Sequence, residues 1–583
     1  MRIDPFRLFR PWLRPYRRQV VLGLGLLLLA QTITLVLPLL LKEAIEHAER
    51  VTEADPAAGA VAAALAEVQV YAWVIAGLAV AGWGVNFGMR WFFTSVSRHV
   101  EHDIRGAYVR HLLRLPLRFF QGRRAGDLMA RATNDVEAIQ RFLHHAFRMT
   151  LMGVLTFVLS LLLMSLIDWQ LALLALAPMP VLAVAASLVS VRVRSGYRRV
   201  QEQFGAISSR IQENLSGVRL VKACAIEDRE IRDFEALNDD YVERNQGLIH
   251  IRSLFFPFTG LLNGTSMLVV LWLGGLRVID GSLTLGAFVA FNLYLIRMSR
   301  PMYLLGRMVD EFQRAAASLG RIGAVLEHPP EDRRAPGRDG LRGEIELRDV
   351  HLAFDGRPVL DGVSLRVPAG GTLAIVGRVG SGKSTLARLI PRLLEADHGE
   401  VLIDGAPVER IPLTTLRAAI GYVPQEAFLF SETIEENIVL DRAPGPVEWA
   451  AGMAQLDPAE FPDGLETVVG ERGVTLSGGQ RQRTALARAL AREPRILILD
   501  DALASVDTAT EEAILDNLRE VMRQRTTILI AHRLSSVRDA DRIVVLDDGR
   551  IAEEGTHEEL VARGGLYAGM HRRQSLAREL TEL

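Results

Sequence analysis

The chain has 583 residues, and its 67 Lys and Arg against 69 Asp and Glu give a formal net charge of −2. That total conceals a division, because residues 1–320 carry a net charge of +9 and residues 321–583 carry −11. The hydrophobic fraction of 49% excludes global disorder, and the single cysteine, Cys224, excludes a disulfide framework and a cysteine-cluster metal site.

Six stretches without Asp, Glu, Lys or Arg lie in the first 310 residues. They predict membrane spans at about 19–41, 68–89, 149–167, 169–191, 253–276 and 281–300. The first five can each cross a hydrocarbon core of about 30 Å as a helix. The sixth, apolar over 281–296, spans if Arg297 and Arg300 snorkel or face a wet interior. A buried core helix explains any single run, but six clustered runs favour a membrane domain over residues 1–320.

The charged loops predict the orientation of these spans. Arginines crowd the segment before the first span and the 90–148 connection, whereas the first connection between spans is acidic. The positive-inside rule therefore places both termini in the cytoplasm of a bacterial cell, with the protein in its inner membrane. The turns at Asp168 and 277–280 then face outside. The connections 90–148 and 192–252 are expected to be long helical extensions into the cytoplasm.

A linker rich in proline and charge at 321–343 separates the membrane part from residues 344–583. Beyond it, the alternating stretch 345–347 and the continuous apolar stretches 373–376 and 496–499 have the pattern of strands, with helical segments between them. This pattern predicts an α/β domain with a mainly parallel sheet. Because this half is acidic, it does not indicate a nucleic-acid partner.

The sequence from Gly377 to Thr385 fits the phosphate-binding pattern G-x-x-x-x-G-K-[ST] between an expected strand and an expected helix. Glycines let main-chain N–H groups surround a polyphosphate, and a lysine supplies a point charge to its β- and γ-phosphates. The candidate ATP-binding residues here are Gly377, Gly380, Ser381, Gly382, Lys383, Ser384 and Thr385. The chain holds only three lysines, so a lysine at 383 in an arginine-rich protein is informative.

The apolar stretch 496–499 ends in Asp500 and Asp501. An acid at the carboxyl end of a strand beside such a loop is where Mg²⁺ is expected, together with the hydroxyl of Ser384. Asp500 and Ser384 are therefore predicted metal ligands, and ATP with Mg²⁺ is the predicted cofactor.

Leu476-Ser-Gly-Gly-Gln480 lies between the two phosphate elements, and with it the chain resembles an ATP-binding cassette (ABC) exporter of the half-transporter type over nearly its whole length. The resemblance implies that Phe354 stacks on adenine, that Gln425 senses the metal and the membrane domain, and that Asp507 belongs to the D-loop. It also implies that His532 is the switch histidine. By the same resemblance, 471–473, 115–136 and 213–227 transmit motion between the membrane and nucleotide domains.

Ser477, Gly478 and Gly479 offer a hydroxyl and main-chain N–H groups at a helix start, which suits a γ-phosphate. In this family Leu476 to Gln480 face the ATP of the partner subunit. One cassette with six spans is half of such a machine, so the resemblance implies a dimer with a second half-transporter subunit.

Asp501 departs from the family pattern, in which glutamate is the general base. Aspartate is shorter by about 1.5 Å, and a misplacement of that size can cost about 10²-fold in rate. One interpretation is a heterodimer with unequal sites, similar to the multidrug exporters of the TmrAB type, in which this chain supplies a weakly hydrolysing site. The alternatives are a homodimer that uses Asp501 and His532 catalytically, and a regulatory, nucleotide-gated subunit.

The fused order of membrane and cassette parts favours export, because importers of this superfamily usually carry them on separate chains. The expected activity is ATPase-driven export of hydrophobic or amphipathic compounds, namely drugs, lipids and peptides, and membrane lipid is an expected partner. Polar residues inside the spans are candidates for the translocation path, although hydrogen bonding between helices explains them equally well. These residues are Gln31, Asn86, Asn263 and Asn292.

Overall fold

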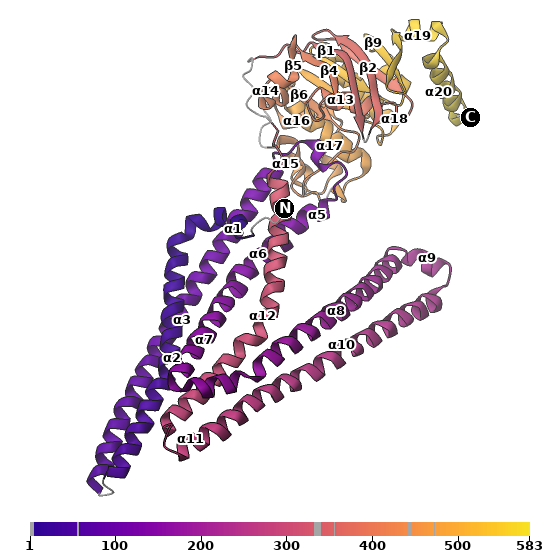
Figure 1. Ribbon diagram of the computed structural model, residues 1–583. Helices are drawn as coiled ribbons and strands as arrows, with labels where there is room; N and C mark the ends of the chain where they lie inside the picture. The colour runs from indigo at the N-terminus through magenta and orange to yellow at the C-terminus, as the bar shows by residue number, and fades with distance from the viewer. Residues whose placement is uncertain are drawn as a thin grey trace. The chain divides into compact units, whose positions relative to one another are not determined.

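The computed structural model describes residues 5–54, 58–331, 340–354, 356–440, 445–470 and 473–582 (Figure 1). The chain divides into two compact units. The first comprises Met1–Leu113 and Arg124–His328, and the second comprises Arg114–Arg123 and Pro329–Leu583. Residues 332–339 of the predicted linker lie outside the described residues.

The first unit is helical throughout its described length, apart from turns. Its elements are α1 (Pro5–Leu13), η1 (Arg14–Tyr16), α2 (Arg17–Ala54), α3 (Ala58–Leu112), α5 (Ala125–Ala130), η2 (Arg131–Asp135), α6 (Val136–Arg141), η3 (Phe142–Ala146), α7 (Phe147–Leu176), α8 (Pro178–Ser216), α9 (Val218–Ala223), α10 (Glu227–Val269), η4 (Val270–Gly274), α11 (Gly275–Ile279) and α12 (Leu285–Leu326). Helix α2 packs along α3, α8 packs along α10, and α12 packs against both α7 and α2.

Four of the described helices are long and apolar enough to cross a membrane, and they cover Phe9–Arg50, Ala66–Leu112, Ala125–Leu176 and Gly260–Ile279. A shorter apolar helix covers Leu285–Met298. The predicted α-helical membrane domain with long helical extensions is confirmed, and these helices are consistent with the six-span pattern. The predicted span 169–191 runs from the end of α7 into α8.

The two short turns expected on one side of the membrane domain lie together. Asp168 has non-helical backbone angles inside α7, and its carboxylate pairs with the guanidinium of Arg277 in α11. Arg277 Nη2 also donates to Gln170 Oε1 at 2.8 Å. This ion pair ties the turn that separates the predicted third and fourth spans to the turn that precedes α12.

The second unit contains two sheets. Its strands are β1 (Ile345–Phe354), β2 (Arg357–Val367), β3 (Thr372–Gly377), β4 (His398–Ile403), β5 (Ala406–Pro407), β6 (Ile420–Val423), β7 (Ile496–Asp500), β8 (Thr526–Ile530), β9 (Arg542–Asp547) and β10 (Arg550–Gly555). One sheet has the order β10-β9-β3-β8-β7-β6, and it is parallel except for the β10–β9 pair. The predicted α/β domain is therefore confirmed, whereas the antiparallel sheet β2-β1-β4-β5 was not predicted.

Helices of the second unit connect these strands. They are α13 (Lys383–Leu389), α14 (Leu413–Ala418), α15 (Ile434–Val439), α16 (Val447–Met453), α17 (Gly478–Ala491), α18 (Thr508–Arg523), α19 (His557–Arg563) and α20 (Leu566–Glu582). Strands β3, β7 and β8 are the centre of the parallel sheet and are almost fully buried. Phosphate and metal chemistry is expected at the carboxyl edge of such strands.

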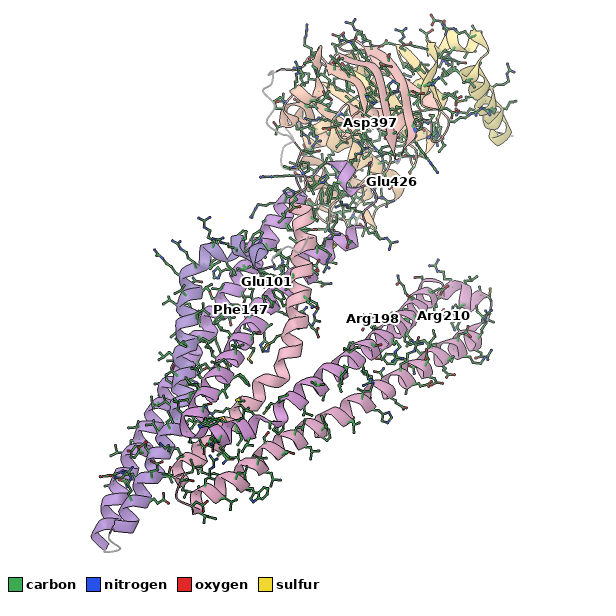
Figure 2. All side chains as sticks on the ribbon, in the orientation of Figure 1. Glu101, Phe147, Arg198, Arg210, Asp397 and Glu426 are labelled. Carbon is green, nitrogen blue, oxygen red and sulfur yellow. The ribbon has the colours of Figure 1, made fainter. Side chains whose placement is uncertain are left out.

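The segment Arg114–Arg123, which contains α4 (Leu117–Phe120), groups with the second unit although it lies between helices of the first. Arg118 Nη1 lies 3.4 Å from Oδ1 of Asp397, a residue that Figure 2 labels in this unit. The Glu331 N–H donates to the Arg114 carbonyl at 2.8 Å. The Glu331 carboxylate in turn accepts two hydrogen bonds from Arg417, at 3.1 and 3.0 Å.

Candidate nucleotide site

Strand β3 delivers the loop 377–382 directly to α13, and the glycines of this loop have backbone angles that other residues rarely adopt. The φ angles are 154° at Gly377, 85° at Gly380 and 99° at Gly382. A Cβ at Gly377 would lie 2.1 Å from the Leu546 carbonyl oxygen, and a Cβ at Gly382 would lie 2.7 Å from that of Val359. The loop can therefore hold this shape only with glycine at these two positions.

Lys383 folds back over the loop with 6% of its surface exposed. Its Nζ donates to the carbonyl oxygens of Gly377 at 2.9 Å and Arg378 at 2.7 Å. Burial lowers the pKa of Lys383, and the carboxylates of Asp501 and Asp500 oppose that shift. The neighbouring Ser381 Oγ is buried and has no hydrogen-bond partner among the described residues. A buried ammonium beside an orphan hydroxyl fits a polyphosphate ligand.

Asp500, at the end of β7, is fully buried and meets Ser384, as the predicted metal site requires. Ser384 Oγ donates to Asp500 Oδ1 at 2.8 Å. The Tyr422 hydroxyl of β6 donates to Asp500 Oδ2 at 3.2 Å. Burial raises the pKa of Tyr422 to about 12, so its hydroxyl remains a donor at neutral pH. Sequence reasoning missed Tyr422, although its strand leads directly to Gln425. Thr385 follows in the first turn of α13 and is half-buried.

Asp501 and His532 face each other at the ends of β7 and β8. The distance from His532 Nε2 to Asp501 Oδ2 is 3.8 Å, which suits an ion pair with a protonated imidazole and is too long for a hydrogen bond. Asp501 has a φ of 51°, in the left-handed region that aspartate tolerates better than most residues. Its N–H donates to the Ile530 carbonyl at 2.9 Å, which fixes this turn.

The loop after His532 is held by a buried carboxylate that sequence reasoning did not find. Glu511 of α18 is 5% exposed, and its Oε1 accepts a hydrogen bond from Ser536 Oγ at 2.6 Å. Its other oxygen pairs with the guanidinium of Arg533. Glu511 belongs to no recognisable motif. In the sequence it is one acidic residue in the first turn of an amphipathic helix, which does not predict a buried contact.

The signature residues form the start of α17. Ser477 is the N-cap, and its Oγ accepts from the Gln480 N–H at 3.2 Å, while Gln480 Oε1 accepts from the Ser477 N–H at 2.9 Å. Leu476 is buried below the cap. This capping box leaves the first main-chain N–H groups of the helix pointing out of its N-terminus, where an anion is favoured.

Gln482, a residue without a predicted role, connects three of the predicted motifs. It is 5% exposed, its Nε2 donates weakly to the Gln425 carbonyl at 3.4 Å, and its Oε1 accepts from the Ser505 N–H at 2.8 Å. A Cβ at Gly478 or Gly479 would lie 3.2 or 3.1 Å from atoms of Ser505. Within the described residues, the signature therefore contacts the loop before Asp507 rather than the loop 377–382.

Other predicted residues lie further from these contacts. Phe354 ends β1, whose partner β2 lies against Gly382 through Val359. The side chain of Gln425 is exposed, and Asp507 caps α18 by accepting from the Thr510 N–H at 3.0 Å. Of the loop 471–473, the first two residues lie outside the described residues, whereas the Gly473 carbonyl accepts from Arg481 Nη1 at 3.2 Å.

Comparison with known proteins agrees with this geometry. Residues 20–302 match the model of the ABC transporter transmembrane region, and residues 360–504 match that of the ABC transporter family. The chain belongs to the ABC transporter family. It is similar to the "Probable multidrug resistance ABC transporter ATP-binding/permease protein YheI" of Bacillus subtilis, with 39% identity over 82% of this chain and 83% of that protein.

Two further relatives extend the comparison within ABC exporters. The "ATP-dependent lipid A-core flippase" of Syntrophus aciditrophicus is 34% identical over 84% of this chain and 83% of that protein. The structure of a bacterial Atm1-family ABC exporter with ATP bound has a TM-score of 0.78 and 31% identity, covering 96% of this chain and 99% of that one. The present chain is therefore an ABC exporter: an integral membrane protein with an ATP-binding domain, whose activity is ATPase-coupled transport.

Proposed function

We propose that this chain is one half of a heterodimeric exporter of the TmrAB type, and that it contributes the weaker of two ATP sites. The main support for this proposal is the aspartate at position 501, where the family has a glutamate as its general base. The backbone angles of the glycines in the loop 377–382, the buried Lys383 and the contact between Ser384 and Asp500 support nucleotide binding at this site. The relatives named for multidrug resistance and for lipid A-core flipping favour hydrophobic or amphipathic cargo, including drugs, lipids and peptides.

The proposed nucleotide site assigns each residue a task. The main chain of 377–382 surrounds the phosphates, Lys383 neutralises them, and Phe354 stacks on the adenine. Ser384, Asp500 and Gln425 would hold Mg²⁺, which would supply positive charge to the phosphates. Ser384 and Asp500 already touch at 2.8 Å, so both ligands lie within reach of one ion.

The proposal of a weakly hydrolysing site rests on the length of the side chain at position 501. A glutamate at position 501 would extend one methylene, about 1.5 Å, further toward the attacking water than Asp501 does, and a deficit of that size costs about 10²-fold. The carboxylate also lies 3.8 Å from His532, the other predicted catalytic residue. We therefore assign Asp501 and His532 to a site that binds ATP and hydrolyses it slowly.

The partner subunit completes both sites under this proposal. The signature Leu476 to Gln480 of this chain faces the ATP of the partner, whose own glutamate supports rapid hydrolysis. The arginine pattern of the loops favours cytoplasmic termini in a bacterial inner membrane, with both ATP sites in the cytoplasm.

The test is ATPase activity of this chain purified alone and with a candidate half-transporter partner. We expect the substitution of glutamine for the partner's glutamate to abolish most turnover, and Asp501→Asn to change it little. Lys383→Ala, as a control, weakens nucleotide binding by this chain. Full turnover after the partner substitution contradicts unequal sites. Loss of turnover with Asp501→Asn, in a chain active alone, establishes the homodimer instead.

Polar residues of the predicted spans form hydrogen bonds either to another helix or within their own helix. Gln31 Oε1 accepts from Thr156 Oγ1 at 2.9 Å, which is hydrogen bonding between helices. Asn86 and Asn292 each donate to a carbonyl one turn earlier in their own helix, at 2.8 and 3.0 Å. Arg297, at the end of the last predicted span, is also held between helices, because its Nη1 donates to the Thr34 carbonyl of α2 at 2.6 Å.

A further inference from the structure

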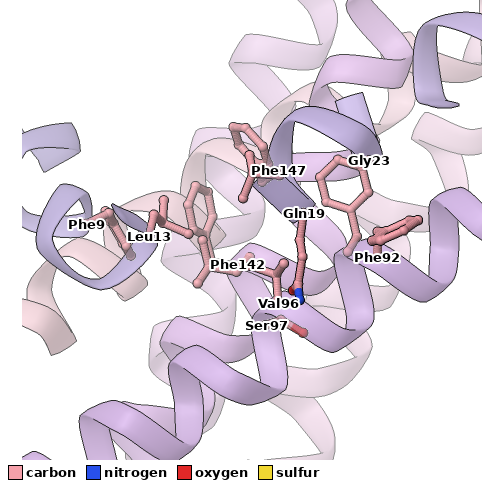
Figure 3. Close-up of a pocket in the computed structure, with 12 residues that line it drawn as sticks. Phe9, Leu13, Gln19, Gly23, Phe92, Val96, Ser97, Phe142 and Phe147 are labelled. Carbon is pink, nitrogen blue, oxygen red and sulfur yellow. The ribbon is translucent and has the colours of Figure 1, made fainter. Parts of the chain in front are cut away.

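A cavity of about 140 Å³ lies in the first unit where α1 and η1 lead into α2 (Figure 3). Its walls come from α1, α2, α3, η3 and α7, and five of its twelve lining residues are phenylalanines. The aromatic lining residues are Phe9, Phe92, Phe93, Phe142 and Phe147. Phe9 is 3% exposed, so α1 closes one wall of the cavity.

One polar atom in this lining has no partner. Gln19 extends from α2 toward Val96 and Ser97 (Figure 3), and its Oε1 is buried without a hydrogen-bond partner among the described residues. The Ser97 hydroxyl is already used, because it donates to the Thr94 carbonyl at 2.8 Å. A buried acceptor without a partner destabilises the protein, so a donor supplied from outside the protein would be favoured there.

The size and the lining define what fits. A dry apolar cavity of about 150 Å³ is known to take a molecule such as benzene. A water molecule needs 2–4 polar partners, and this cavity offers the Gln19 oxygen amid phenylalanines. We propose that the cavity is a binding site for a compact aromatic molecule with one hydroxyl, a phenol, whose O–H donates to Gln19 Oε1.

Such a ligand would act on the packing of α1. It would contact Phe9 of α1, Phe92 of α3 and Phe142 of η3 together. Phe9 and Phe142 already pack with ring centroids 5.5 Å apart. Binding therefore stabilises the folded state, and the stabilisation grows with the free ligand concentration. This site is separate from the nucleotide site and does not depend on the identity of the exported compound.

Glycines of α2 provide a matched pair of variants. Gly23 lines the cavity, and a Cβ there would lie 3.4 Å from Phe92 Cβ and from Phe93 Cε2, so alanine fits and occupies part of the space. A Cβ at Gly25 would meet no atom within 4 Å. Both changes add the same methyl group to the same helix, but only Gly23→Ala fills the cavity.

The experiment measures binding of 4-fluorophenol and fluorobenzene to the full chain, with its partner if one is required, in lipid nanodiscs by fluorine NMR. Protein-free nanodiscs report partition into lipid and are subtracted. We expect saturable binding, with 4-fluorophenol at least about tenfold tighter than fluorobenzene, as one hydrogen bond of about 1.4 kcal/mol gives. Gly23→Ala should weaken both ligands, Gly25→Ala neither, and Gln19→Leu should remove only the preference for the phenol.

Two outcomes overturn the proposal. If wild-type protein binds no more of either compound than protein-free nanodiscs do, the cavity is not a ligand site. If Gly25→Ala weakens binding as much as Gly23→Ala, the ligands bind elsewhere. The preference of the wild-type protein for the phenol tests the role of Gln19 even if Gln19→Leu fails to fold.

Discussion

Gln574 Nε2 donates to the main-chain carbonyl of His532, with 2.6 Å between the two atoms. Gln574 Oε1 also accepts from the Leu534 N–H at 2.8 Å. One amide group of α20 therefore holds the main chain on both sides of Arg533, beside a histidine whose ring lies 3.8 Å from the Asp501 carboxylate. Gln574 touches no predicted phosphate ligand, so we regard it as a positioning residue for His532.

The first prediction concerns this clamp. Gln574→Ala should lower the hydrolysis rate at the site of Asp501 and His532 by roughly tenfold, because a loosened histidine is displaced from its productive geometry. The KM for ATP should not change, since the loop 377–382 is untouched. Steady-state kinetics in complex with a partner that lacks its own glutamate isolates this site.

Controls for the clamp come from the same helix. Ser575→Ala alters the next residue of α20 and should leave the rate unchanged, whereas Gln574→Glu keeps an acceptor for the Leu534 N–H and should lose less activity than Gln574→Ala. A fall in kcat for Gln574→Ala that is matched by an equal fall in the amount of ATP bound at saturation would point to general unfolding and would contradict a positioning role.

The second prediction compares two glycines of the phosphate loop. Gly382→Ala should abolish nucleotide binding, because its Cβ would lie 2.7 Å from the Val359 carbonyl oxygen and 2.9 Å from Leu360 Cδ2. Gly380→Ala meets no atom within 4 Å, so its penalty is the left-handed backbone, about 1–2 kcal/mol. Titration with a fluorescent ATP analogue measures both. Equal losses in the two variants would show that the crowding at Gly382 is not what shapes the loop.

Local patterns in the sequence were sufficient for some of these features and not for others. The strand before Gly377 and the strand ending at Asp500 each have a continuous apolar run, so their places in the parallel sheet followed from the sequence. Gln574, Gln482 and Tyr422 could not be found in this way, because each acts through contacts with residues distant in sequence. The antiparallel sheet was missed because β1 and β2 pair with bulges that break the alternation of apolar residues.

The third prediction concerns pH and the ion pair between η2 and α12. Asp135 is 8% exposed and accepts from Arg321 Nε and Ser318 Oγ, each at 2.9 Å. Burial alone would raise the pKa of Asp135, but the hydrogen bonds from Arg321 and Ser318 outweigh it and lower the pKa below its usual value. The stabilisation is therefore complete above about pH 4 and is lost as the pH falls through the lowered pKa.

Thermal unfolding of the Asp135→Asn variant tests this predicted dependence of stability on pH. The variant should melt several degrees below the wild-type protein at pH 7, and the gap should narrow below about pH 4, where the wild-type carboxylate becomes protonated. Asp127→Asn is the control, because Asp127 pairs with Arg131 one turn away and is largely exposed, so its change should be near zero. A gap that stays constant down to pH 3 would assign the cost to packing rather than to charge.

The last prediction concerns the proline in α2. Pro38 has no N–H, so the Thr34 carbonyl one turn earlier lacks its helical partner, and Arg297 Nη1 of α12 donates to that oxygen at 2.6 Å. Arg297→Met should therefore destabilise the protein by about 1–3 kcal/mol, because a buried carbonyl loses its donor. Pro38→Ala restores an N–H at the right position. A double-mutant cycle, followed by thermal unfolding, should show that Arg297→Met costs less in the Pro38→Ala background, by about 0.5–1.5 kcal/mol.

Tyr294 supplies the matched control, since its hydroxyl donates to the Leu35 carbonyl at 2.6 Å, and Leu39, one turn after Leu35, keeps its own N–H. The cost of Tyr294→Phe should consequently be the same with proline or alanine at position 38. If the effects of Arg297→Met and Pro38→Ala on stability are simply additive, the guanidinium is not the substitute for the missing helical hydrogen bond.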